Sequence, residues 1–253
     1  MTQTWPALSA RVSWLASELS NFDAEQFFTA LIGEAPETVQ KNRKVGPANP
    51  FLNLVSGHCP FGQAVIQVQP DRVDLIVSSD VSNGITVGPP ECFDFRDFLS
   101  TYVTNRTWEE TSVSGAYRIA IGATLLKEAN SYPEAIDVIS DLTGISIPFR
   151  DVWDFGFQLN RRKQIIENTE INRLIKYSVA LFSGFVVNQQ FISGQNNSRV
   201  SEISSNTNVM VELDVNTVPS AFVLTHEFQG EILKALAMEA ETLASDPKIE
   251  RLG

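Results

Sequence analysis

The most restrictive feature of the sequence is a pair of short alternating segments joined by a tight turn. Apolar side chains occupy every second position from Ala64 to Val68 and again from Val73 to Val77. The connection, Gln69-Pro70-Asp71-Arg72, is typical of a β-turn because proline presets φ at the first central position. Strands joined by so short a connection are antiparallel, and their alternation indicates a sheet with one solvated face. A purely parallel sheet is not compatible with this hairpin.

Capping residues and apolar stripes predict four helices. Asp23, Asp94 and Ser131 are expected to be N-caps, whose side chains accept hydrogen bonds from the first free N–H groups. Gly144 is expected to end the third helix, because glycine readily adopts the left-handed conformation. The last helix shows the strongest pattern, with apolar residues at helical spacing from Leu224 to Leu243.

Alternation also predicts the remaining strands. They are expected at residues 8–19, 117–125, 152–160, 174–187 and 209–215. Residues 37–60 and 188–206 are polar and show little periodicity. We expect these two stretches to be long surface loops, which are suitable for recognition.

The order of elements predicts an α+β fold. Each half of the chain reads strand, helix, strands, helix, with a divide near residues 109–114. We expect two similar lobes, residues 1–110 and 111–253, around a mainly antiparallel sheet, with the long helix at the C-terminus. The lobes either share one sheet or pack side by side, and one continuous domain is compatible with the same order.

Composition limits the partners and the compartment. The 253 residues are 43% hydrophobic, which is enough for a sizeable core, and 30 acidic against 19 basic residues give a net charge of −11. This acidity argues against nonspecific binding to nucleic acid or to anionic membranes. No secretory signal or membrane-spanning stretch is recognised, and Cys59 and Cys92 are the only cysteines. We therefore expect a cytoplasmic protein without disulfides.

Several short motifs carry a resemblance to a known family. They are Phe22-Asp23-Ala24-Glu25, Asp71-Arg72-Val73, Tyr117-Arg118-Ile119-Ala120-Ile121, Leu213-Asp214-Val215-Asn216-Thr217 and the terminal helix. Together they resemble a widespread bacterial family of α+β proteins of similar length to which no activity is assigned. The sequence departs from the family at Gly122-Ala123-Thr124-Leu125 and at Leu243-Ala244-Ser245-Asp246. The resemblance implies a bacterial protein and a fold, and it implies no chemistry.

Few titratable residues stand at spacings typical of catalysis. The sequence has no C-x-x-C or H-x-x-x-H pair, no G-x-S-x-G elbow and no phosphate-binding glycine motif. We therefore predict no cofactor, no metal and no catalytic residue. If the protein is an enzyme, such as a hydrolase or a small-molecule-binding enzyme, its site is expected between the lobes. The residues available for that site are Arg118, Asp214, His226 and Glu231. Arg118 and Asp214 are alternatively a structural pair across the sheet.

Two basic groups stand out in this acidic chain and are candidates for binding an anion or a protein partner. They are Lys41, Arg43 and Lys44, and Arg161, Arg162 and Lys163. The alternative is that both groups simply face water. The strand at 174–187 is long and apolar, so at a sheet edge it invites pairing with another chain. Taken together, these features favour a non-enzymatic interaction module, a scaffold, adaptor or regulatory subunit with protein partners or self-association.

Overall fold

A computed structural model describes residues 5–17, 19–46, 50–79, 91–146, 154–166, 169–192, 195–220 and 222–252 of the protein. Residues 108, 184–192 and 195–205 are described by their backbone alone. Trp153 and the Ser193-Gly194 step, which the sequence places in a strand and in a loop, lie outside the described residues.

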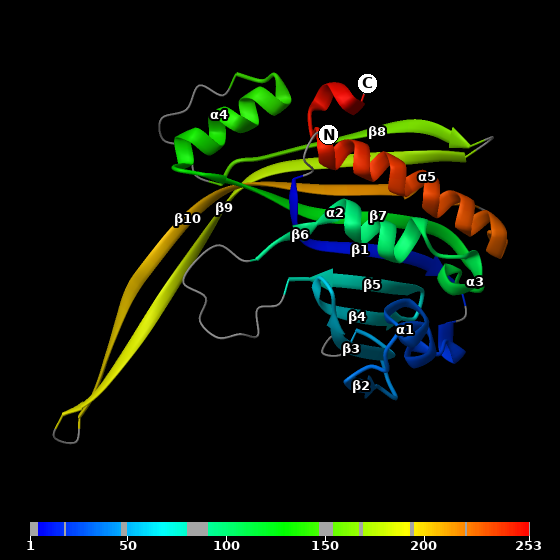
Figure 1. The fold of residues 1–253 in the computed structure, drawn as a ribbon, viewed down its shortest axis with the longest axis horizontal. Coiled ribbons are helices and arrows are strands. Elements are labelled where there is room, and N and C mark those ends of the chain that lie inside the picture. The colour runs from blue at the N-terminus through cyan, green and yellow to red at the C-terminus, as the bar shows by residue number, and fades with distance from the viewer. Residues whose placement is uncertain are drawn as a thin grey trace.

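Ten strands form one sheet (Figure 1). They are β1 (Pro6–Ala16), β2 (Thr38–Lys41), β3 (Asn53–Cys59), β4 (Gly62–Gln69), β5 (Arg72–Ser78), β6 (Phe93–Asp94), β7 (Ala116–Ala129), β8 (Gly156–Ile166), β9 (Thr169–Ile192) and β10 (Gln195–Thr217). Their order is β2-β3-β4-β5-β1-β7-β10-β9-β8, with β6 paired to the start of β1, and all the pairings are antiparallel. The α+β class and the mainly antiparallel sheet are confirmed.

The helical segments are mostly short and connect or cover the strands. They are α1 (Ala24–Ile32), α2 (Phe95–Leu99), α3 (Trp108–Thr111), α4 (Tyr132–Thr143), α5 (His226–Ser245), the 3₁₀ turns η1 (Leu19–Asn21) and η3 (Ile249–Leu252), and the π-helical η2 (Ser100–Thr104). Figure 1 shows α1, α2 and α5 over one face of the sheet. Within the described residues, no helix combines the length and apolar character needed to cross a membrane.

The capping residues predicted from the sequence occupy their expected positions. The side chains of Asp23, Asp94 and Ser131 each accept a hydrogen bond from a backbone N–H in the first turn of the following helix. Gly144 ends α4 with a φ of 64°, a left-handed conformation that a side chain would disfavour. Local sequence therefore determines where these helices begin and end.

The two halves of the chain meet at the pair β1 and β7. Trp14 on β1 lies opposite Ile119 on β7, and Val12 lies opposite Ile121. On one side β1 is flanked by β5, the last long strand of its half, and on the other side β7 is flanked by β10, the last strand of its own half. Each half thus folds its later strands back beside its first one.

Alternate residues of the central strands form the core together with the helices. The ring of Trp14 is 1% exposed and meets Phe27 of α1 edge-on, with centroids 5.5 Å apart. Ile232 and Leu236 of α5 are fully buried within the same hydrophobic cluster. Burial of these side chains is the main source of stabilisation.

Both predicted loops contain strands, so these two predictions were wrong. Residues 37–60 include β2 and β3, and residues 188–206 lie mostly in β9 and β10. All four residues of β2 are exposed, so β2 has no buried face that could leave an alternating pattern in the sequence.

Strands β9 and β10 continue well beyond their neighbours. β8 pairs with β9 only as far as Ser178, and β7 pairs with β10 only from Thr207 onward. Among the described residues, residues 179–192 therefore pair only with β10, and residues 195–206 pair only with β9. We call them the extension, and Figure 1 shows them leaving the body of the sheet. At a strand's rise per residue, the extension is roughly 40–45 Å long.

Ile232→Ala is expected to lower the free energy of unfolding by about 2–5 kcal/mol, because it opens a cavity between α5 and the sheet. Met238→Ala is the matched control on the same helix, since Met238 is 68% exposed. It is expected to stay within about 0.5 kcal/mol of the parent. Chemical denaturation measures both, and equal losses would contradict the assignment of α5 to the core.

Candidate functional site

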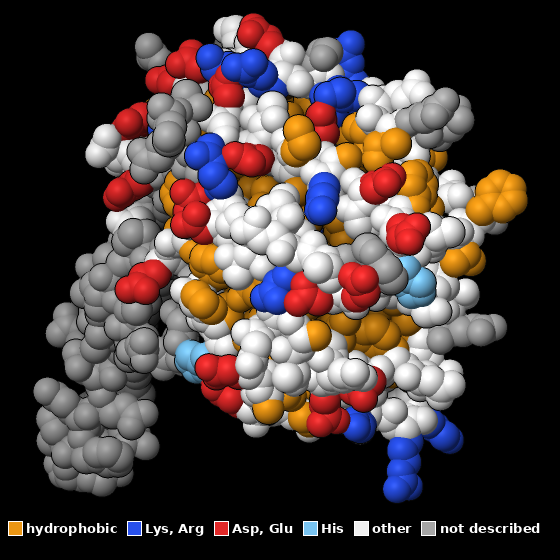
Figure 2. Space-filling model, turned by 45° about the vertical axis from the view of Figure 1, so that its right-hand side comes forward, with side chains coloured by type: hydrophobic (Ala, Val, Ile, Leu, Met, Phe, Trp, Pro, Cys, Tyr) orange, Lys and Arg blue, Asp and Glu red, His pale blue; other side chains and the backbone are white. Residues whose placement is uncertain are grey.

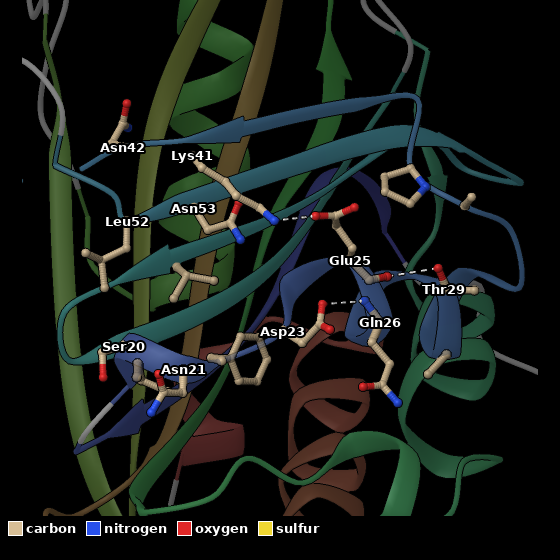
Figure 3. Close-up of a pocket in the computed structure, with 16 residues that line it drawn as sticks. Ser20, Asn21, Asp23, Glu25, Gln26, Thr29, Lys41, Asn42, Leu52 and Asn53 are labelled. Atoms are coloured by element: carbon tan, nitrogen blue, oxygen red, sulfur yellow. Dashed lines mark hydrogen bonds and ion pairs between the residues drawn. The ribbon is translucent and has the colours of Figure 1, made fainter. Parts of the chain in front are cut away.

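A cleft of about 920 Å³ lies between α1 and the end of the sheet formed by β2 and β3 (Figure 3). Polar side chains from both sides line it. Those labelled in Figure 3 include Asp23, Glu25, Gln26 and Thr29 from the α1 side and Lys41, Asn42 and Asn53 from the strand side. Apolar residues such as Phe22, Leu52 and Val68 also line the cleft, so its surface is mixed, and one of its walls ends at the open edge of β2.

The charges in the cleft are already engaged with one another or with the backbone. Lys41 Nζ lies 2.7 Å from Glu25 Oε1, and this contact raises the pKa of Lys41 because the carboxylate favours the protonated amine. Asp23 accepts a hydrogen bond from the N–H of Gln26 as the N-cap of α1. Lys41 is therefore not placed as an unpaired cation for an anion in the cleft.

A smaller hollow of about 440 Å³ lies over β7. We call it the central groove. Its side chains alternate with the core residues of the same strands, so it lies on the sheet face away from α5. The groove is deepest over Gly122, because this residue has no side chain to fill the space. A Cβ at this position would lie only 3.2 Å from Leu213 O. The charged residues that line it are Arg11, Lys176, Glu212 and Asp214.

Opposite charges pair across the central groove. Arg11 Nη2 lies 3.2 Å from Asp214 Oδ2, and Lys176 Nζ lies 2.5 Å from Glu212 Oε2. All four side chains are about one-third exposed, so solvent screens both pairs. The groove consequently presents a nearly compensated surface to any ligand.

A more deeply buried polar network lies beside the groove, between β1 and β5. Asp74 is 3% exposed and accepts hydrogen bonds from Ser13 Oγ at 2.5 Å and from Arg72 Nε at 2.8 Å. Arg72 Nη2 also donates to Ser13 Oγ at 3.2 Å. Because every member has a partner, this network can be buried without a large desolvation penalty.

Two of the four predicted catalytic candidates lie close together. Arg118 Nη2 donates to Asn216 Oδ1 at 2.7 Å, and Asn216 Nδ2 donates to Asp214 Oδ1 at 2.5 Å. Arg118 and Asp214 are thus linked through Asn216, while the ion-pair partner of Asp214 is Arg11. Arg11 was not among the residues predicted from the sequence, although its alternation with Val12 places it on the polar face of β1.

The other two candidates lie in the helical layer. His226 is the first residue of α5, and its Nδ1 lies 2.7 Å from Ser112 Oγ. Glu231 is exposed on the same helix. Since α5 covers the opposite face of the sheet from the central groove, the four residues do not share one pocket. A single active site built from all of them is not formed.

The cysteines and His58 are the remaining candidate nucleophiles and metal ligands of the sequence. Burial raises the pKa of the Cys92 thiol, which disfavours the reactive thiolate. His58 Nδ1 lies 3.2 Å from Glu37 Oε1 at the β2–β3 edge. Within the described residues, no three His, Cys, Asp or Glu side chains are grouped closely enough to hold a metal ion.

The two basic groups lie near opposite ends of the sheet. Lys41 ends β2, and Arg43 and Lys44 follow it as exposed residues. Arg161, Arg162 and Lys163 lie in the middle of β8, at the other end of the strand order. Over the part of the surface seen in Figure 2, acidic and basic side chains are interspersed.

No family model matches the chain, and the comparisons with curated proteins and with solved structures give no match either. Function is therefore inferred from the strand edges, grooves and side-chain contacts of this chain.

The two carboxylates on the groove side of the sheet are expected to differ sharply in their effect on stability. Asp74→Ala is expected to cost about 2–4 kcal/mol, because it leaves Arg72 and the buried Ser13 hydroxyl without their acceptor. Asp214→Ala is expected to cost about 1 kcal/mol or less, because its pair with Arg11 is partly exposed. Urea denaturation near neutral pH measures both, and similar losses would contradict this ranking.

Proposed function

We propose that this protein is a non-enzymatic interaction module of the bacterial cytoplasm, acting as a scaffold, adaptor or regulatory subunit. The observation that carries the proposal is the extension. Each of its strands has one edge with no strand partner among the described residues. Unpaired N–H and C=O groups along a strand are a template for pairing with another strand.

The composition of the extension supports the same proposal. Residues 179–206 contain two charged residues, Arg199 and Glu202, and no proline. Monomeric proteins usually guard open strand edges with charges, prolines or short strands. The extension lacks most of these devices, and Leu181 at its base is 51% exposed. Pairing with a protein partner or with a second copy of the chain would cover this surface.

In this proposal the two halves, residues 1–110 and 111–253, are similar lobes that share the sheet, and the second lobe carries the extension. This division into two similar lobes is supported by the repeated order of strand, helix, returning strands and helix. The bacterial cytoplasm as the site of action rests on the motif resemblance and on the two cysteines in the sequence.

A second candidate is a small-molecule site in the central groove, which includes an enzyme such as a hydrolase. The observation in its favour is that β1 of the first half and β10 of the second both line the groove. Its volume of about 440 Å³ suits a small ligand. The compensated charges of the groove make this candidate weaker than the first.

Shortening the extension tests the interaction module. Leu181 and Thr207 are opposite each other in the register, so an Asn-Gly turn can join them and replace residues 182–206. The full-length chain is expected to self-associate or to recover specific proteins from its host, and the shortened chain is expected to lose them. Light scattering and affinity purification with mass spectrometry measure the two outcomes.

The shortened chain provides its own folding control, because all the pairings of β7 and β8 remain in it. Its circular dichroism and melting temperature should stay close to those of the parent after allowance for the removed strands. If both chains are monomers and recover the same proteins, the extension is not an interaction element and the proposal fails.

A further inference from the structure

The outer strand β8 is a second open edge, with a chemistry different from that of the extension. β8 pairs with β9 along one side, and no strand pairs with its other side within the described residues. Its 11 residues are exposed or half-buried throughout. An edge of this length leaves a row of backbone donors and acceptors open to a further strand.

Three successive cations occupy the middle of this edge. Arg161 and Lys163 point to the helix-covered face, since they lie opposite Arg173 and Ile171, and Arg162 points to the other face. Arg162 lies 3.6 Å from Glu170, an exposed pair that contributes little. No ion pair within the described part of the chain includes Arg161.

The cations on the helix-covered face outnumber the carboxylates that contact them. Glu239 of α5 pairs with both Lys163 and Arg173. Arg173 is 4% exposed and also donates to the carbonyl oxygen of Leu252 at 2.6 Å, while its buried Nε has no partner among the described residues. Arg161 lies directly opposite Arg173 across the strand pair. Like charges in this position repel, and an added anion beside Arg161 would relieve the repulsion.

Resting on the proposed interaction function, we propose that β8 binds an extended acidic segment of a partner protein by strand addition. The partner's backbone continues the ladder beyond β8, and successive carboxylates lie beside Arg161, Arg162 and Lys163. Phe157 and Leu159 are half-buried on the same face as Arg161, so an apolar side chain next to the acidic run packs beside them. Backbone pairing supplies affinity, and these side chains supply selectivity.

The charge pattern excludes a second copy of the chain as the occupant of this edge. Two copies of β8 paired antiparallel about Arg162 would place three cations opposite three cations. Pairing of β8 with β2 of a second copy would also bring like charges together, because β2 ends in Lys41 and is followed by Arg43 and Lys44. The occupant is therefore a different protein with carboxylates at these positions.

Nucleic acid is a less suitable occupant than an acidic peptide. Phosphates would meet the cations and accept from the edge N–H groups, but they carry no donor for the C=O groups that alternate with them along the strand edge. The net charge of −11 also opposes the approach of a polyanion at long range.

Fluorescence anisotropy with a labelled peptide tests the proposal. The probe is Thr-Val-Thr-Glu-Asp-Glu-Thr-Val-Thr, whose valines lie on the same face as its two glutamates, and the matched control peptide has Gln-Asn-Gln at its centre. The full chain is expected to bind the acidic peptide at least about tenfold more tightly than the control peptide, with the difference reduced at high salt. A third peptide, with the acidic sequence and alternate backbone nitrogens methylated on one edge, is expected to bind about tenfold more weakly, because it cannot pair with β8.

Variants locate the binding edge. Arg161→Gln with Arg162→Gln leaves the contacts among Lys163, Arg173 and Glu239 in place, and it is expected to remove most of the preference for the acidic peptide. Arg43→Gln with Lys44→Gln changes the net charge equally at the other edge and is expected to preserve binding. Circular dichroism checks that both variants fold.

Three results would overturn the proposal: equal binding of the acidic and control peptides, equal binding of the methylated peptide, or displacement by duplex DNA at lower concentration than by unlabelled peptide. The last result would identify the edge as a nucleic-acid site. The chain with the shortened extension should still bind the peptide, because β8 is intact in it. Failure at β8 is thereby distinguished from failure of the extension as an interaction element.

Discussion

The pairing of β1 with β7 is the interaction on which the rest of the structure depends. It joins the two halves into one ladder, and its register sets Val12 and Trp14 opposite Ile121 and Ile119 on the face that the helices cover. A shift by one residue would turn every one of these side chains to the other face. The same register places Arg11 and Gly122 opposite each other, and so it creates the central groove.

The placement of charge follows from this two-sided sheet. On the face of the central groove, opposite charges compensate each other, as Arg11 of β1 and Asp214 of β10 do at 3.2 Å across the intervening strand β7. In the part of the chain that the structure describes, the outer strand β8 has no further neighbour, and the compensation is incomplete around Arg161. At an edge, another molecule can form the missing backbone hydrogen bonds and also supply the opposite charges. Binding is therefore better supported at the edges than catalysis is in the groove.

Sequence reasoning succeeded where local chemistry decides the structure. Asp23 and Ser131 have the capping geometry that their side chains predict, and the hairpin of β4 and β5 follows from its turn. It failed for β2, which is exposed throughout and so lacks the alternation that burial of one face produces. It also failed for residues 188–192 and 195–206, which pair only within the extension and show little periodicity in the sequence. Their strand state is set by pairing with a distant segment, which a single sequence does not display. Arg11 was not predicted for a similar reason, because its pair with Asp214 joins positions 203 residues apart.

The mismatch in strand length determines where the extension can accept a partner. The neighbouring strand β8 ends at Gly156, opposite Ser178, and β7 ends at Ala129, opposite Thr207, so the body of the sheet has a step on each side of the extension. A strand added along β9 would continue the line of β8, and one added along β10 would continue the line of β7. An isolated two-stranded ribbon is only marginally stable in water, whereas a third strand makes it considerably more stable. A partner strand added along β9 or β10 would therefore stabilise the extension. Strands in the interior of the sheet are already paired on both sides, so they would gain no such stabilisation from a partner.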